Sequence, residues 1–396
     1  MLTVAHSSTL RPLRDLIEPR PSRPETVLTL AKAVTDPLGT IEAFELPPSV
    51  KKHFESVLDA VADGRGRTFW VQSEYGGGKT HFIAALTALL TPSTAEDDRA
   101  ARVWAAVNDA DVRGRAHEFV NRRILPVAIS CKGIMAIDGQ YSRALLRLLM
   151  DGISDALTAY GLDEKIPVTE DQAMVSHFLD RPADLRATID AWCAREHGSS
   201  VTSLFETEGP ESAARAYRDW CRRVTGAEPN VDLKVVDWLT SLCRRLRDHG
   251  FDGFLVVVDE FATLQNLATA KPDVAAYEDV LESLGWLVPQ RMHQQADNDF
   301  GVYLIVASQL KNPTKLDERC TPLLLLAQEA ARDYEIIVSR RVRTLRPDHL
   351  ADVDQYYHHH KLTYDTYARM DLDRFREVFP FQPRVFDAIW NITASA

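Results

Sequence analysis

Residues 68–82 read TFWVQSEYGGGKTHF, and this stretch decides the expected fold. The apolar run Thr68–Gln72 predicts a β-strand, and apolar positions at helical spacing predict a helix over His81–Leu90. Three glycines lie between the two elements. A strand, a glycine-rich loop and a helix in this order are the context that a phosphate-binding loop requires.

The loop offers the groups that bind phosphate. Glycines let several backbone N–H groups converge on one anion, and the helix that starts near Lys79 adds the positive end of its dipole. Lys79 would reach the β- and γ-phosphates, and the Thr80 hydroxyl would hold Mg²⁺. Ser73 stands where the Gly-x4-Gly-Lys-Ser/Thr pattern has its first glycine. The expected phosphate-binding residues are Ser73, Glu74, Tyr75, Gly76, Gly77, Gly78, Lys79, Thr80 and His81.

A plainer interpretation of the same loop stays open. A flexible glycine-rich turn can precede a Lys-Thr pair without binding any nucleotide. His81, which follows Thr80 directly, is expected to be structural rather than catalytic.

A second group of polar residues follows the apolar run Phe254–Val258. Such a run is typical of a strand buried on both faces, so Asp259 would lie at the carboxyl edge of the sheet, beside the phosphate loop. Asp259 can bind Mg²⁺, and Glu260 can orient and deprotonate an attacking water. The alternative is a surface Asp-Glu pair after an ordinary core strand.

Further candidates follow the later strands. Ser308 or Gln309, after the apolar run Val302–Ala307, could contact the γ-phosphate or the water, and Asn312 is a further candidate on the next turn. Phosphoryl transfer also needs positive charge, often from an arginine. The arginines considered are Arg319, which we take as the catalytic candidate, and Arg340, Arg341 and Arg384. Each could instead be a solvated or ion-paired residue.

The overall composition is that of a globular protein. The 396 residues are 45% hydrophobic and 26% charged, which excludes a disordered or fibrous chain. No apolar run approaches the roughly 18 residues of a membrane span, and the N-terminus has no signal-peptide pattern. We therefore expect a cytoplasmic protein without membrane contact. The net charge of −11 gives no general attraction to nucleic acid, although a local basic face stays open.

Strands and helices alternate along the chain, which favours an α/β fold with a central parallel sheet. The strands expected besides Thr68–Gln72, Phe254–Val258 and Val302–Ala307 are Ile124–Ser130 and, as the last strand, Tyr334–Val338. The expected divisions are an irregular, proline-rich lead-in (1–45), the first part of the core (46–162), a helical insertion (163–230), the second part of the core (231–346) and a helical C-terminal lid (347–396).

Three weaker features favour ordinary roles. The five scattered cysteines fit reduced, mostly buried thiols and not a zinc site. His358–His360 are expected to be an exposed polar tract, because adjacent helical residues point apart. The basic residues 340, 341, 343 and 346 fit a solvated face or a subunit contact better than a nucleic-acid site.

Taken together, the loop and the Asp259-Glu260 strand resemble the additional-strand, catalytic-glutamate class of P-loop ATPases, near the AAA+ group. The resemblance implies a three-layer αβα fold with sheet order 5-1-4-3-2, ATP and Mg²⁺ as ligands, and a helical lid. The loop through His81-Phe82 is also similar to that of the large BrxC/PglY-type ATPases of bacterial phage-defence systems. LRDLI at 13–17 and FPFQP at 379–383 resemble features of the same group. Its members are much longer, so we expect this chain to be a piece of a longer protein.

The expected function is Mg²⁺-dependent ATP hydrolysis that drives or switches a larger bacterial assembly with protein partners. Two alternatives remain open: a nucleotide-binding scaffold with little hydrolysis, and a DNA-stimulated motor, against which the net charge weighs. A homo-oligomer is compatible with the sequence, because many such ATPases complete their site with a neighbour's arginine.

Overall fold

The structure of the chain is a computed structural model. The structure describes residues 10–19, 28–73, 78–93, 98–137, 139–162, 170–226, 235–294, 300–312, 319–325, 333, 335–340, 343–364, 370–381 and 385. None of their helices is long and apolar enough to cross a membrane.

The centre of the molecule is a five-stranded sheet with the order β3-β4-β5-β2-β6, and every pair of neighbours is parallel. The strands are β3 (Ile124–Ser130), β4 (Gly253–Asp259), β5 (Gly301–Ser308), β2 (Arg67–Ser73) and β6 (Cys320–Leu325). Numbered from the loop strand onward, this is the order 5-1-4-3-2 that the resemblance implies. The chain is therefore an α/β protein, as its alternating pattern predicts.

The expected last strand was wrong. Residues 335–340 are helical, and the fifth strand is β6, which begins at Cys320. β6 contains Pro322, and it lies at the edge of the sheet, where the ladder does not need a proline N–H.

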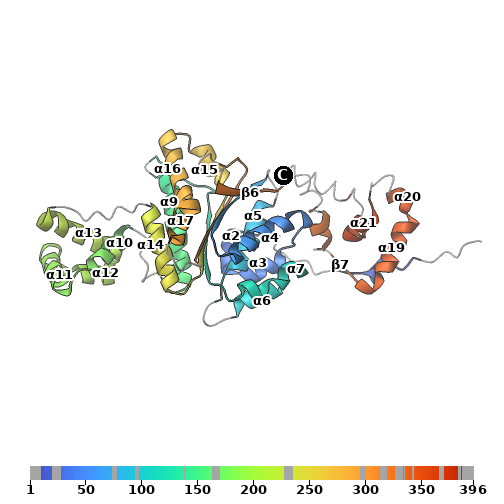
Figure 1. Cartoon of the computed structure of the whole chain (residues 1–396), viewed down its shortest axis with the longest axis horizontal. Coiled ribbons are helices and arrows are strands. Elements are labelled where there is room, and N and C mark those ends of the chain that lie inside the picture. The colour runs from blue at the N-terminus through green and yellow to red at the C-terminus, as the bar shows by residue number, and fades with distance from the viewer. Residues whose placement is uncertain are drawn as a thin grey trace, which may run out of the picture.

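Helices cover both faces of the sheet (Figure 1). One face packs against α9 (Tyr141–Ala159), α14 (Val235–Asp248), α15 (Phe261–Leu267), α16 (Lys271–Glu282), the π-helical turn η2 (Ser283–Leu287) and α17 (Val288–His293). The other packs against α2 (Leu30–Thr35), α3 (Pro37–Ala43), α4 (Pro48–Ala62), α5 (Lys79–Leu90), α6 (Arg99–Ala105), α7 (Ala110–Gly114) and α8 (Ala116–Phe119). The result is a three-layer αβα arrangement.

Alternating side chains of each strand supply the two cores. In β4, Phe254 and Val256 belong to the first core, and Leu255 and Val257 belong to the second. Because both faces are buried, the strand needs no polar alternation, which explains its continuous apolar sequence. Helix α5 is buried at every position from Phe82 to Leu90, so it lacks a polar face.

Residues 170–226 form a separate helical unit that projects from one side of the sheet (Figure 1). It comprises α10 (Glu170–Leu179), α11 (Ala183–His197), α12 (Val201–Glu208), α13 (Pro210–Trp220) and η1 (Cys221–Thr225). Its hydrophobic cluster, centred on Tyr217, contains no residue of the sheet.

An N-terminal segment, 13–19, and a C-terminal segment, 343–378, form one further unit, which we call the terminal subdomain. It comprises α1 (Leu13–Leu16), β1 (Ile17–Pro19), β7 (Arg343–Leu345), η4 (Pro347–His349), α19 (Leu350–His359), α20 (Lys361–Thr363) and α21 (Leu372–Val378). β1 pairs antiparallel with β7, and Leu16 lies in one cluster with Phe375 and Phe379. The described part of the first 45 residues is thus not irregular: it contains α1, β1, α2 and α3. Figure 1 places the subdomain at the opposite end from α10–α13.

Two other expectations concern side chains. All five cysteines are free thiols, and four of them are buried. His358, His359 and His360 are exposed, as expected of a polar tract.

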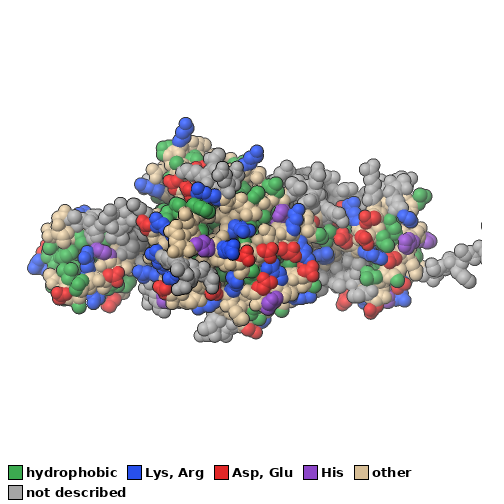
Figure 2. Space-filling view, in the orientation of Figure 1, with side chains coloured by type: hydrophobic (Ala, Val, Ile, Leu, Met, Phe, Trp, Pro, Cys, Tyr) green, Lys and Arg blue, Asp and Glu red, His purple; other side chains and the backbone are tan. Residues whose placement is uncertain are grey.

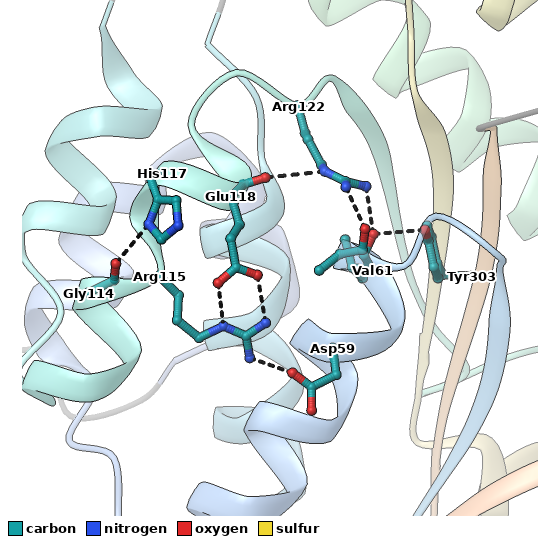
Figure 3. Close-up of polar contacts among 9 residues, drawn as sticks. Asp59, Val61, Gly114, Arg115, His117, Glu118, Arg122 and Tyr303 are labelled. Atoms are coloured by element: carbon teal, nitrogen blue, oxygen red, sulfur yellow. Dashed lines mark hydrogen bonds and ion pairs between the residues drawn. The ribbon is translucent and has the colours of Figure 1, made fainter.

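The end of α4 is fixed to the sheet by polar contacts shown in Figure 3. The Arg122 guanidinium donates to the carbonyl oxygen of Val61 at 2.7 Å, and the Tyr303 hydroxyl of β5 donates to the same oxygen at 3.3 Å. Arg115 joins Asp59 of α4 to Glu118 of α8, at 2.7 and 2.8 Å. The contacts of Arg122 and Tyr303 serve a carbonyl at the end of the helix, where no further helical N–H follows, and those of Arg115 link side-chain carboxylates of two helices. They hold α4 where the chain turns into β2.

Leu16 tests whether the N-terminal segment belongs to the terminal subdomain. Leu16 is fully buried, whereas Leu13 in the same helix is 43% exposed. We expect Leu16→Ala to destabilise the subdomain by about 2–5 kcal/mol, the usual effect of removing a buried leucine side chain. Amide hydrogen exchange in α19 and α21 measures this loss. Leu13→Ala is the control; an equal effect of both variants would contradict the placement.

Candidate phosphate-binding site

The carboxyl ends of the parallel strands gather the candidate residues at one edge of the sheet. Ser130 is in register with Asp259, and Gln72 is in register with Ser308. Ser73 is the last residue of β2. Residues 74–77, which include Glu74, Tyr75, Gly76 and Gly77, lie outside the described residues.

Gly78 ends the loop in a conformation that suits glycine. Its φ of 76° and ψ of 10° lie in the left-handed region, which side chains other than glycine rarely adopt. A Cβ atom at this position would meet nothing within 4 Å, so the backbone angle and not space favours glycine. The Gly78 carbonyl oxygen accepts from the Phe82 N–H at 2.9 Å, which starts helix α5.

Lys79, the first residue of α5, turns back toward the end of β2. Its Nζ donates to the carbonyl oxygen and to the Oγ of Ser73, both at 3.0 Å. Burial lowers the pKa of Lys79, and the negative charges of Glu260 and Asp259 oppose that shift. The serine that replaces the first glycine of the motif is therefore a direct partner of the lysine.

Thr80 and Asp259 meet although they are far apart in the sequence. The Thr80 Oγ1 donates to the Asp259 Oδ2 at 2.9 Å, and the Glu260 backbone N–H donates to Oδ1 at 2.8 Å. Asp259 is only 5% exposed. One buried carboxylate thus ties the first turn of α5 to the residue that follows β4.

Glu260 has an unusual backbone. Its φ of 53° is the only positive value among the described residues other than glycine. The left-handed conformation costs a residue with a Cβ about 1–2 kcal/mol. Strain of this kind gathers at functional sites, because the surrounding structure must hold the residue in place.

The pKa of the Cys131 thiol responds to its burial and to the negative charge at this edge of the sheet. The Cys131 N–H donates to the Asp259 carbonyl oxygen at 2.9 Å. Burial, together with the charges of Asp259 and Glu260, raises the pKa of its thiol to about 12. The sequence reasoning did not connect this cysteine to the site, because nothing in its spacing shows that β3 lies beside β4.

The three polar candidates after β5 differ in their surroundings. Ser308 is buried and donates from Oγ to the Gln265 Oε1 at 2.7 Å. Gln309 is exposed, and Asn312 is half-buried. Gln265 was missed by the sequence reasoning, since a single glutamine in a short helix has no distinctive spacing.

Arg319 lies away from the other candidates. It directly precedes β6, so it is at the amino edge of the sheet, opposite the phosphate loop. Its guanidinium stacks on Trp286 at 4.6 Å from the ring centroid and pairs with Glu282 at 3.1 Å. A six-residue strand separates Arg319 from the loop edge, about 20 Å at 3.3 Å per residue. The structure does not bring Arg319 to the site of its own chain.

The structure describes the remaining basic candidates only in part. Arg340 is half-buried at the end of the helical segment 335–340, and His81 is half-buried in the first turn of α5. Arg341 and Arg384 lie outside the described residues, as does the side chain of Arg343. Comparison with protein-family models, curated proteins and solved structures gives no match to this chain.

The donor set at the edge fits a magnesium ion. Hydroxyl and carboxylate oxygens are the ligands that Mg²⁺ prefers, and Thr80 and Asp259 present one of each within hydrogen-bond distance. Among the described residues, no group of three or more His, Cys, Asp and Glu side chains could form an all-protein metal site. Mg²⁺ bound with a nucleotide does not need one, because phosphates and waters complete its shell.

The strained backbone of Glu260 can be measured directly. Glu260→Gly and Glu260→Ala both remove the carboxylate, but only glycine adopts the left-handed conformation without cost. We expect the glycine variant to be more stable than the alanine variant by about 1–2 kcal/mol in the free energy of unfolding. Urea denaturation measures the difference. Equal stabilities, or a more stable alanine variant, would show that the site does not hold this strain.

Proposed function

We propose that the chain binds ATP and hydrolyses it with the help of Mg²⁺. The observation that carries the proposal is the contact between Thr80 and Asp259, which joins the loop of the first motif to the strand end of the second. The strand order, which agrees with that of the catalytic-glutamate ATPases, supports the same conclusion. ATP, rather than another nucleotide, is proposed from the resemblance.

The triphosphate would lie on the N-terminus of α5. Backbone N–H groups at the start of this helix have no partner within it and favour an anion. The Lys79 ammonium, which Ser73 now orients, would exchange its contacts with Ser73 for the β- and γ-phosphate oxygens. Because Lys79 is partly desolvated, water screens its charge less than it would screen the charge of a fully exposed lysine.

Thr80 and Asp259 would hold Mg²⁺, which neutralises charge on the phosphate oxygens when it is bound. The Thr80 hydroxyl contacts the Asp259 carboxylate, so the oxygens of the two side chains already face one another. Little rearrangement is then needed, and preorganised groups lose less entropy on binding.

Glu260 would orient the attacking water and accept its proton. The water oxygen forms a bond to the γ-phosphorus, the bond from that phosphorus to the bridging oxygen breaks, and ADP and phosphate leave. The Asp259 carboxylate holds the Glu260 backbone N–H, so the backbone from which the Glu260 side chain extends has a defined position. General-base catalysis of this kind contributes about 10²–10⁴ in rate.

In the proposed mechanism, Arg319 would act on the phosphate loop of a neighbouring chain. It cannot reach its own phosphate loop, but a neighbouring chain could present it to that site, and we therefore propose a homo-oligomer as the active form. Glu282 and Trp286 fix the guanidinium at the amino edge of the sheet.

The wider role comes from the resemblance to phage-defence ATPases. We propose that hydrolysis switches or drives a larger bacterial assembly through protein partners. Nucleic acid is the weaker candidate partner. The chain has a net charge of −11, and Figure 2 shows acidic side chains gathered over the side of α3 and α7, with basic ones scattered among them.

Two substitutions separate binding from hydrolysis. We expect Glu260→Gln to bind ATP normally and to lose about 10²–10⁴ in turnover, because its amide cannot accept the proton. Lys79→Ala should weaken ATP binding about 10- to 100-fold, since a hydrogen bond to a charged group contributes about 1.5–3 kcal/mol. Isothermal titration and steady-state phosphate release measure the two effects.

Exposed residues of the same type serve as controls for these variants: Lys52→Ala in α4 and Glu206→Gln in α12 should leave both binding and turnover unchanged. Tight binding without turnover in the wild type, alone and with its partners, would favour the nucleotide-binding scaffold. Loss of binding in Lys52→Ala equal to that in Lys79→Ala would contradict the assigned site.

A further inference from the structure

Gln265 joins helix α15 to the end of β5. Its Oε1 accepts from the Ser308 Oγ at 2.7 Å, and its Nε2 donates to the Lys311 carbonyl oxygen at 3.2 Å. The second contact fixes the orientation of the amide, because only its nitrogen can donate to a carbonyl. The side chain therefore makes two directed hydrogen bonds to the strand end and the turn after it.

Trp70 of β2 connects the same two segments through one hydrogen bond and one ring contact. Its Nε1 donates to the Leu310 carbonyl oxygen at 3.1 Å, and its ring meets Phe261 of α15 edge-on, with centroids 5.7 Å apart. Phe261 is fully buried. Helix α15 is thus held at its first residue by packing and at Gln265 by hydrogen bonds.

The helix held in this way begins directly after Glu260. The Glu260 backbone is strained, with φ of 53°, so it keeps its conformation only while its surroundings hold it. On one side it is held by the Asp259 carboxylate. On the other side it is held by α15, and hence by the contacts of Gln265.

We infer that Gln265 is a positioning residue for Glu260, and the inference rests on the proposed hydrolysis. Gln265 ties the glutamate to Ser308, which lies in register beside Gln72, next to the Ser73 that contacts Lys79. Ser308 therefore acts on the reaction through Gln265 and the position of α15, and it does not need to touch the γ-phosphate. Gln309, which is exposed, has no part in this connection.

Gln265→Ala tests the inference by steady-state kinetics. We expect kcat to fall about 10- to 100-fold with no change in ATP affinity, because misplacement of a catalytic group by about 1 Å can cost as much as 10²-fold. Gln265→Glu keeps the acceptor for Ser308 and loses the donor to Lys311, so its kcat should be intermediate. Ser308→Ala combined with Gln265→Ala should lose no more than Gln265→Ala alone, as expected of residues that act as one unit.

Asn266→Ala is the matched control, because Asn266 is exposed in the same helix. It should leave kcat unchanged. An unchanged kcat in Gln265→Ala, beside an active wild type, would overturn the positioning role and leave the proposed hydrolysis standing. A fall in affinity equal to the fall in kcat would also overturn it, since a general loss of structure would produce that result.

Hydrogen exchange tests the same connection without turnover. In the nucleotide-free protein, we expect the amides of Glu260 and Leu310 to exchange at least about tenfold faster in Gln265→Ala than in the wild type, with no change in α5. Unchanged exchange at Glu260 would overturn the inference even if the wild type hydrolyses nothing. An inactive wild type, by contrast, would count against the proposed hydrolysis.

Discussion

The hydrogen bond between the Thr80 hydroxyl and the Asp259 carboxylate is the constraint on which the site depends. It is partly buried, its carboxylate is buried, and it joins residues that are 179 positions apart in the sequence. A buried carboxylate without partners would be costly, so its two oxygens need the Thr80 hydroxyl and the Glu260 N–H. The same pairing aligns the start of α5 with the end of β4. Because β2 and β4 both run parallel to β5, the start of α5 and the end of β4 lie at the same edge of the sheet.

The elements with strong local patterns were predictable. The loop strand, helix α5 and strand β4 carry continuous apolar runs or glycines that few other structures accommodate, and the candidate residues Lys79, Thr80, Asp259 and Glu260 follow from them. The fifth strand was not predictable in this way. Ile336 and Val338 suggest a strand but lie in a helical segment, whereas Pro322 argues against the strand that exists. An edge position tolerates that proline, and the edge is a property of the whole sheet.

The parts of the site that escaped prediction depend on contacts between distant segments. Gln265 acquires its role from Ser308 and the turn after β5, and Cys131 from its place beside Asp259. Arg319 illustrates the opposite error. The sequence pattern placed it after the strand Val302–Ala307 and predicted no strand at 320–325. Because Arg319 directly precedes β6, which runs parallel to β2, it lies at the edge opposite the loop.

The pairing of β1 with β7 has a consequence for how the chain can fold. Ile17 is paired with Leu345, and the entire sheet lies between them in the sequence. During synthesis the segment 13–19 emerges before the sheet, whereas its partners emerge after the last strand of the sheet. The apolar side chain of Leu16 therefore stays exposed while the sheet forms. The terminal subdomain can form only after the segment 343–378 has been synthesised. Pairings over such long sequence separations are slow to form, because the loop must be closed before the contact contributes.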